Sequence, residues 1–273
     1  MQRLIFNITP TILVAVSLNG ADNSADFGLA MTLEAYVYTF ATAINGLFMP
    51  RVSRIIAQGK RAEELMPLFL KIGRIQFMLI GMLTIGFIAL GQTFIDDVWK
   101  QSNFGQTYLS AVLLILPSVF YLPMQIANTT LIVENKVKLQ AKVFILMGLI
   151  NVVCSVILSK HFGAIGASIS IFIAYMVRTI LMGIIYHVNL KFDMWKFIKE
   201  VYLKLTPQLI LALIIGILLE YFNPISNVYI RFISNGIILV LGYFITMLFC
   251  GFNKYEKNLL FGIFRKVVRS NKE

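Results

Sequence analysis

The sequence predicts an all-α integral membrane protein with about eight transmembrane helices. Of its 273 residues, 58% are hydrophobic and only 14% are charged, whereas a soluble domain carries about 25% charged residues. Its mean hydropathy of +0.80 is too high for a surface that faces water. About eight apolar runs approach the roughly 20 residues that a helix needs to cross a bilayer. These runs do not alternate between polar and apolar residues, which argues against an outer-membrane barrel.

The expected helices follow one another with short connections. The second run should end at Pro50, because proline interrupts helical hydrogen bonding. Pro117 and Pro123 fall inside the fourth run and predict bends there. Gly163 and Gly166 predict a tight turn between the fifth and sixth runs. In chain order the runs are Leu4–Gly20, Phe27–Met49, Leu68–Gly91, Tyr108–Val133, Ala141–Ser159, Gly163–Tyr186, Leu205–Phe222 and Val228–Cys250.

Basic residues gather in alternate connections between these runs. The connections after the second, fourth, sixth and eighth runs contain Arg51, Arg54, Lys60 and Arg61, with Lys71 and Arg74 just beyond; Lys136 and Lys138, with Lys142 at the edge; Lys191, Lys196, Lys199 and Lys204; and Lys254, Lys257, Arg265, Lys266, Arg269 and Lys272. The intervening connections contain mainly Asp22, Asp26, Asp96 and Asp97, with Lys100 and Lys160, and Arg231 at the start of the eighth run. Because basic flanks stay cytoplasmic, both termini and the Arg51–Arg61 loop are predicted to be cytoplasmic. The net charge of +11 then reflects topology, and no nucleic-acid partner is expected.

The C-terminal segment from Asn253 to Arg269 has a different pattern. Its apolar residues recur at helical spacing, and its basic residues lie largely off that face. This predicts an amphipathic helix on an anionic inner leaflet, with a simple charged anchor as the alternative.

Residues that could carry chemistry are few, and none forms a catalytic or metal-binding motif. We therefore expect neither an enzyme nor a cofactor or metal site. Two ionisable residues fall within apolar runs, where each costs about 2.5–3.5 kcal/mol at a helix centre. Glu34 shares a helical face with Tyr38 and Asn45, which predicts either a wet cavity or polar packing between helices. Arg178 either faces the protein interior or extends to the inner interface.

The fourth run has a second polar face. Ser118, Tyr121, Gln125 and Thr129 lie along one side of this proline-bent helix. Bent helices with polar inner faces are typical of transporter cavities, so Gln125 joins the candidate residues.

Three stretches resemble one family of membrane transporters. FMPRVSRIIAQGKRAEEL resembles the end of the eighth helix of polysaccharide flippases, with its Pro-Arg-x-Ser pattern and short basic loop. KHFGAIGASIS resembles the hairpin before their twelfth helix. Between them, PMQIANTTLIVENKVKLQAKVFILMGLINVVCSVILSKHFG resembles their tenth and eleventh helices. The resemblance covers about residues 7–186 and is to the polysaccharide transporter branch of the multidrug/oligosaccharidyl-lipid/polysaccharide flippase superfamily.

The resemblance implies a domain organisation. Residues 1–187 correspond to the second six-helix lobe of such a transporter, 188–252 to the extra helix pair of fourteen-helix members, and 253–273 to a basic cytoplasmic tail. The first lobe is missing, so a partner chain or a longer protein would have to supply it.

The resemblance also implies a function. It predicts flipping of a lipid-linked oligosaccharide, of the undecaprenyl-pyrophosphate type, across the bacterial inner membrane. Arg3 or Arg178 would meet the pyrophosphate, and Glu34 would bind a coupling cation or a sugar hydroxyl. Tyr38, Asn45 and Gln125 would complete the substrate-binding residues. The alternatives are a multidrug or cation antiporter of the same superfamily and a non-transporting scaffold for envelope assembly.

Overall fold

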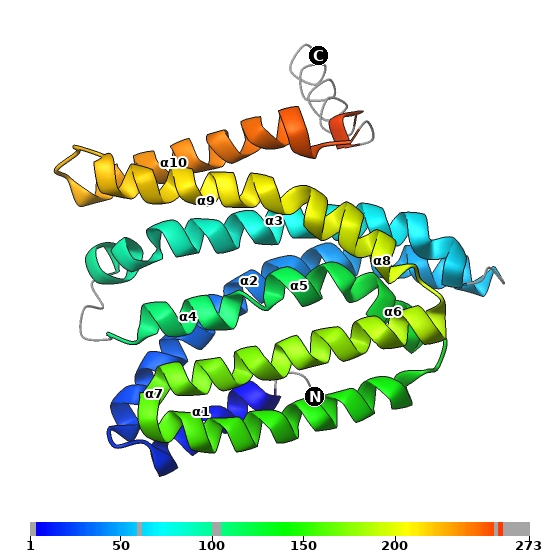
Figure 1. Ribbon diagram of the computed structural model, residues 1–273, viewed down its shortest axis with the longest axis horizontal. Helices are drawn as coiled ribbons and strands as arrows, with labels where there is room; N and C mark the ends of the chain where they lie inside the picture. Colours follow the sequence, from blue (N-terminus) through cyan, green and yellow to red (C-terminus); the bar gives the residue numbers. More distant parts are fainter. Residues whose placement is uncertain (1–3, 59–61, 100–104, 254–255, 259–273) are drawn as a thin grey trace.

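The computed structural model describes residues 4–58, 62–99, 105–253 and 256–258, and most of these residues are helical (Figure 1). The all-α class predicted from the sequence is confirmed for this part of the chain. Six of its helices are long and apolar enough to cross a membrane, and one shorter apolar helix precedes them. The α-helices are α1 (Leu4–Val16), α2 (Gly20–Ala57), α3 (Met66–Thr93), α4 (Thr107–Ile115), α5 (Ser118–Tyr121), α6 (Gln125–Val133), α7 (Val137–Leu190), α8 (Met194–Phe197), α9 (Lys204–Phe222) and α10 (Val228–Thr246).

Short 3-10 or π turns join or extend several of these helices. They are η1 (Ala62–Leu65), η2 (Phe94–Val98), η3 (Leu122–Met124), η4 (Ile198–Leu203) and η5 (Met247–Gly251). Because η4 connects α8 directly to α9, residues 194–222 form one continuous helical segment.

The long helices lie side by side in a bundle that has two flanks (Figure 1). On one flank, α9 and α10 pack against each other and against α3. On the other, α1 packs against α7 and α2. Between the flanks, α2 contacts α4 and α6, and α3 contacts the proline-bent segment that contains α5 and η3. The buried core runs through this middle layer.

The helix α7 is a hairpin whose two arms meet at Gly163. This glycine has φ +57° and ψ −130°, a backbone conformation that is essentially restricted to glycine. A Cβ atom there would lie 2.4 Å from Oδ1 of Asn23 in α2. The arms, 137–162 and 164–190, run back along each other (Figure 1), and Oγ of Ser170 donates to Oδ1 of Asn151 at 3.1 Å. The tight turn predicted at Gly163 is confirmed.

The predictions made from the prolines were wrong at Pro50 and confirmed at Pro117 and Pro123. The expected end of the second helix at Pro50 is wrong, because α2 continues through this exposed residue to Ala57. Proline removes one backbone hydrogen bond from a helix. Where the helix face is exposed, the freed carbonyl can bind another partner, so the proline kinks the helix without ending it. The bends predicted in the fourth run are confirmed: Pro117 separates α4 from α5, and Pro123 lies in the 3-10 turn η3.

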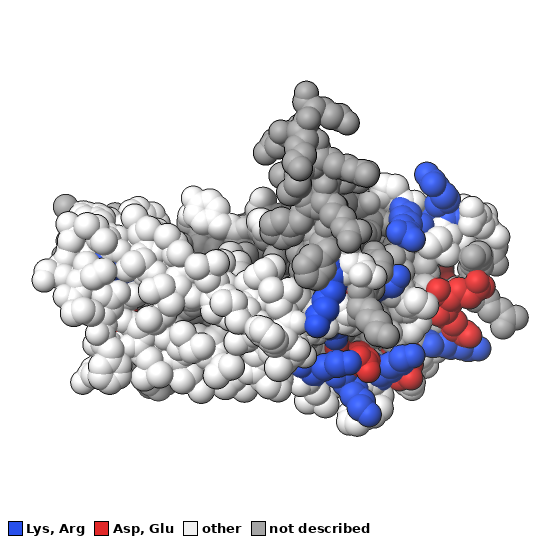
Figure 2. Space-filling view, turned by 90° about the horizontal axis from the view of Figure 1, so that it is seen from above, with Lys and Arg blue, Asp and Glu red and all other residues white. Residues whose placement is uncertain are grey.

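Charged side chains gather at one end of the bundle. Figure 2 shows lysine, arginine and acidic side chains concentrated at the end where α2, α6 and α8 terminate or turn, while the opposite end is nearly free of them on this face. The basic connections that follow the second, fourth and sixth apolar runs lie together at this end. Nζ of Lys191 lies 3.7 Å from Oε1 of Glu63, and Nζ of Lys136 donates to the carbonyl of Asn189 at 2.8 Å. The amphipathic helix predicted for the C-terminal segment lies mostly outside the described residues.

Candidate functional site

The strongest candidate site is a buried arginine enclosed by aromatic rings. Arg178, in the second arm of α7, is only 3% exposed. Its guanidinium carbon lies 4.8 Å from the ring centre of Tyr121 in α5, 5.2 Å from that of Phe144 in the first arm, and 5.9 Å from that of Tyr175. The alternative in which Arg178 extends to the interface is therefore wrong for this conformation: the cation turns into the bundle.

Helical spacing and small residues explain how this cluster forms. Tyr175 and Arg178 are three residues apart, so they share a face of the second arm. The same arm buries Gly163, Ala167, Ser170 and Ala174, and small residues allow neighbouring membrane helices to approach closely. The rings of Tyr121 and Tyr175 then meet with centroids 5.1 Å apart, forming one wall of the cluster.

The guanidinium retains an unused hydrogen-bond donor. Nε of Arg178 is buried and has no hydrogen-bond acceptor among the described residues. A desolvated cation–π contact contributes about 2 kcal/mol, which offsets part of the 2.5–3.5 kcal/mol that an arginine costs at the centre of a membrane helix. Aromatic faces do not accept the N–H group as a carboxylate or phosphate would. The Nε–H group of Arg178 is therefore available to donate a hydrogen bond to an oxyanion.

Glu34 belongs to the same part of the bundle. Its side chain, in α2, is 1% exposed, and both Glu34 and Arg178 interact electrostatically with the Tyr121 hydroxyl. The structure thus places two of the residues singled out from the sequence within electrostatic range of the same tyrosine. Their separation of 144 positions in the chain gave no sign of this proximity.

The remaining candidate residues lie in two other polar clusters or outside the described chain. Asn45 accepts a hydrogen bond from Nε2 of Gln76, a fully buried residue of α3. Tyr38 lies on α2 between Glu34 and Asn45 and packs against the core. Gln125 bonds with Asn128 at 3.5 Å, and Asn128 accepts from Gln140 at 2.8 Å.

Arg3 lies outside the described residues. Gln76 was missed because one glutamine inside an apolar run resembles an ordinary packing residue. Tyr175 could have been found from its position one turn before Arg178.

A second buried arginine forms a complete ion pair. Arg74 in α3 is 3% exposed, and its Nε and one terminal nitrogen bind both carboxylate oxygens of Glu256, at 2.6 and 2.9 Å. Its terminal nitrogens also donate to the carbonyls of Glu200 and Gly251, each at 2.7 Å. Because all of these donors are satisfied, this arginine fastens the C-terminal segment to α3 and offers no vacant anion site. The sequence suggested only that Arg74 was a basic flank of a cytoplasmic loop.

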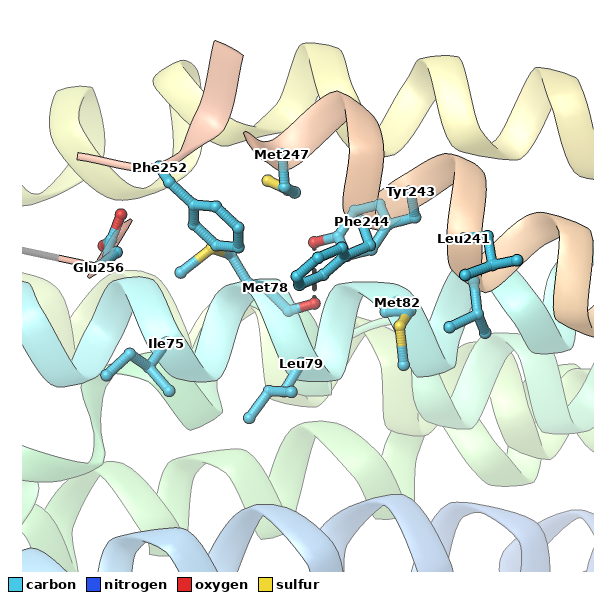
Figure 3. Close-up of a pocket in the computed structure, with 11 residues that line it drawn as sticks. Ile75, Met78, Leu79, Met82, Leu241, Tyr243, Phe244, Met247, Phe252 and Glu256 are labelled. Atoms are coloured by element: carbon cyan, nitrogen blue, oxygen red, sulfur yellow. Dashed lines mark hydrogen bonds between the residues drawn. The ribbon is translucent and has the colours of Figure 1, made fainter. Parts of the chain in front are cut away.

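Three cavities along the bundle have apolar walls. One, of about 300 Å³, lies between α3 and α10 and ends at Glu256 (Figure 3). In that view Phe252, Met247 and Phe244 lie over Met78, and the Tyr243 hydroxyl donates to the carbonyl of Met78 at 2.9 Å. A second, of about 350 Å³, lies between α2, α3 and α10. The third, of about 620 Å³, lies between the second arm of α7 and the α8–η4 segment.

Neither Glu34 nor Arg178 lines any of these three cavities. Arg178 and Glu34 are only 3% and 1% exposed, so a ligand in direct contact with both side chains requires the groups packed around them to move. Among the described residues, no group of three or more His, Cys, Asp or Glu side chains is placed to hold a metal ion.

Comparisons with known proteins leave the geometry as the guide to function. No family model, no curated protein and no solved structure matches this chain.

Proposed function

We propose that the protein is one part of a transporter that moves lipid-linked oligosaccharide units across the bacterial inner membrane. In this proposal the chain has eight membrane spans, counting α1 and the two arms of α7 separately. Both termini lie in the cytoplasm, on the side of the charged end. Residues 1–187 act as one lobe of a flippase, and a second lobe on another chain or a longer protein completes the cavity. The sequence resemblance to polysaccharide flippases motivates the substrate class.

The observation that carries the proposal is the buried Arg178. A guanidinium inside a membrane bundle, surrounded by three aromatic rings and retaining a free Nε–H donor, is suited to a pyrophosphate oxygen. Arginine binds such oxyanions with short, charge-assisted hydrogen bonds. Intramembrane ionisable residues typically mark substrate or ion pathways. The nearby Glu34 and Tyr121 supply a carboxylate and a hydroxyl that suit a coupling cation or a sugar hydroxyl.

The proposed cycle is alternating access. In the closed state the rings of Tyr121, Phe144 and Tyr175 hold Arg178 away from lipid. Separation of the second arm of α7 from α5 exchanges cation–π contacts for hydrogen bonds to the substrate pyrophosphate. The prolines at 117 and 123 supply flexible points next to this contact, since bent membrane helices commonly line transport pathways.

The test uses a flippase-deficient bacterium that expresses this chain together with a first lobe. Arg178→Gln should abolish polymer export while the protein still accumulates in the membrane, and Arg178→Lys should retain part of the export because it keeps the positive charge. Arg231→Gln is the matched control, since Arg231 also lies in a membrane helix but near its end, beside Glu220. Normal export with Arg178→Gln at normal abundance would remove the arginine from the mechanism.

A non-transporting scaffold is the second candidate. It is favoured by one observation: the three cavities described above open between outer helices and none reaches the arginine cluster. Export restored only when a first lobe is supplied would support the transporter. If polymer export requires this chain but is equally supported by a variant with both Arg178 and Glu34 replaced, the scaffold is supported.

A further inference from the structure

The largest of the three cavities is a groove at the charged end of the bundle. Its volume is about 620 Å³, within the range of small-molecule sites. One wall is the last part of α7, including Ile180 and Ile184, which are 61% and 55% exposed. The other wall is the α8–η4 segment, including Trp195, which is 70% exposed. The groove therefore opens on the outer surface of the bundle, where a membrane protein meets lipid.

Three polar groups that line this groove are already hydrogen-bonded to the backbone. Oγ1 of Thr179 donates to the carbonyl of Tyr175 at 2.7 Å. The Tyr202 hydroxyl donates to the carbonyl of Phe120. Nδ1 of His187 lies 2.9 Å from the carbonyl of Phe192, which can only accept. A sugar or nucleotide would find few free partners here, whereas a hydrocarbon chain needs none.

The chain segment that contains the second wall of the groove carries a net positive charge. Residues 187–204 contain four lysines and two acids, which gives a net charge of +2. Lys196 and Lys199 are exposed and follow Trp195 on the same helical segment. Of the acids, Asp193 accepts the backbone N–H of Lys196, and Glu200 pairs with Lys204 at 3.2 Å. Lys191, one turn beyond His187, lies 3.7 Å from Glu63. Lys196 and Lys199 therefore remain available to a phosphate.

We propose that this groove is a binding site for an anionic phospholipid of the surrounding leaflet. One acyl chain lies between Ile180, Ile184 and Trp195, and the phosphate contacts Lys196 and Lys199. The indole of Trp195 stands between chain and headgroup, the position that tryptophan favours at a membrane interface. This inference does not depend on the proposed transport function, because it concerns the outer surface and does not involve Arg178.

The fluorescence of Trp195 can report whether a lipid occupies this groove. It has two tryptophans, and Trp99 lies by η2, away from the groove. In a Trp99→Phe variant, all tryptophan fluorescence comes from Trp195. Reconstitution into vesicles of phosphatidylcholine with brominated phosphatidylglycerol or brominated phosphatidylcholine, at equal mole fraction, measures how often each lipid occupies the groove. The Trp195→Phe variant, which reports from Trp99, is the control.

We expect brominated phosphatidylglycerol to quench Trp195 with an association constant about fivefold or more above that of brominated phosphatidylcholine, since each lysine near an anionic lipid contributes about this factor. Trp99 should show no such preference. Lys196→Gln together with Lys199→Gln should remove the preference at Trp195. Lys138→Gln with Lys142→Gln, two exposed lysines near the start of α7, should leave it intact.

A second variant tests the groove itself. Gly183 lines the groove, and a Cβ there meets nothing nearer than 4.0 Å, so Gly183→Phe should fill the space and lower quenching by both brominated lipids. Gly148→Phe is the matched control, because Gly148 also lies in α7 beside open space.

Equal quenching of Trp195 by the two lipids would overturn the anionic site. Lipid preference unchanged in the Lys196/Lys199 variant would do the same. Protection of Trp195 from both lipids, with crosslinking between two copies, would assign the groove to a protein contact instead.

Discussion

The ion pair between Arg74 and Glu256 allows a quantitative test of how the C-terminal segment is held. Glu256→Gln keeps the shape of the side chain but removes its charge. The two side chains are only 4% and 5% exposed, so solvent screens the pair little. Removing one partner of a buried pair costs about 3–5 kcal/mol, because the other charge stays buried without compensation. Arg74 would keep its bonds to the carbonyls of Glu200 and Gly251, which places the expected loss near the lower value, about 3 kcal/mol.

The measurement is equilibrium unfolding in mixed detergent micelles, followed by circular dichroism. Glu200→Gln is the control, because its partner Lys204 is 51% exposed and Glu200 itself is 40% exposed. Such a surface pair contributes at most about 1 kcal/mol. A double-mutant cycle with Arg74→Gln should give a coupling energy of about 2 kcal/mol. If Glu256→Gln changes the unfolding free energy no more than Glu200→Gln does, the reasoning from burial is wrong.

Three further predictions concern the fold and its orientation. Gly163→Ala should destabilise the protein by about 2 kcal/mol or more, because alanine is strained in that backbone conformation and its Cβ would clash with Asn23; Gly148→Ala, at an open helical position, should be neutral or slightly stabilising in the same unfolding assay. Asn235→Leu should cost about 1–3 kcal/mol, because buried Asn235 donates to Glu220 and accepts from Asn223 and leucine can do neither; a loss below the error of the assay would contradict this. In a chain whose native cysteines are replaced by serine, a cysteine at Asn227 should react with an impermeant maleimide in intact cells, and one at Gln58 only after permeabilisation; the reverse pattern would invert the proposed topology.

Helix boundaries were largely predictable because lipid imposes a simple length requirement. Apolar runs of about 20 residues mark helices whatever their neighbours, so most of the described helices fall where the sequence places them. Gly163 was predictable for a similar reason, since a glycine pair between two apolar runs indicates a turn. Pro50 was not, because whether a proline ends a helix depends on what surrounds the freed carbonyl.

The partners of the buried charges were not predictable from one sequence. Arg74 and Glu256 are 182 positions apart, and Arg74 resembles one more basic flank of the loop before it. Arg178 had two physically reasonable positions, and only the packing of Tyr121 and Phe144 against it decides between them. Pairings of this kind depend on tertiary contacts between distant helices, which neither periodicity nor hydropathy encodes.

The polar contacts along α3 restrict how the last two membrane helices can move. Near one end of α3, Arg74 binds Glu256; near the other, Oγ1 of Thr93 donates to Glu220 of α9 at 2.6 Å, and Glu220 also accepts from Asn235 of α10 at 2.8 Å. Arg74 and Thr93 are 19 residues apart in α3, about 28 Å at 1.5 Å per residue, which is close to the thickness of a bilayer core. Apolar helix faces slide easily past one another in lipid, but two polar attachments this far apart along α3 fix the register. The helices α3, α9 and α10 should therefore translate and tilt as a single block, and a separation of the second arm of α7 from α5 would leave this block intact.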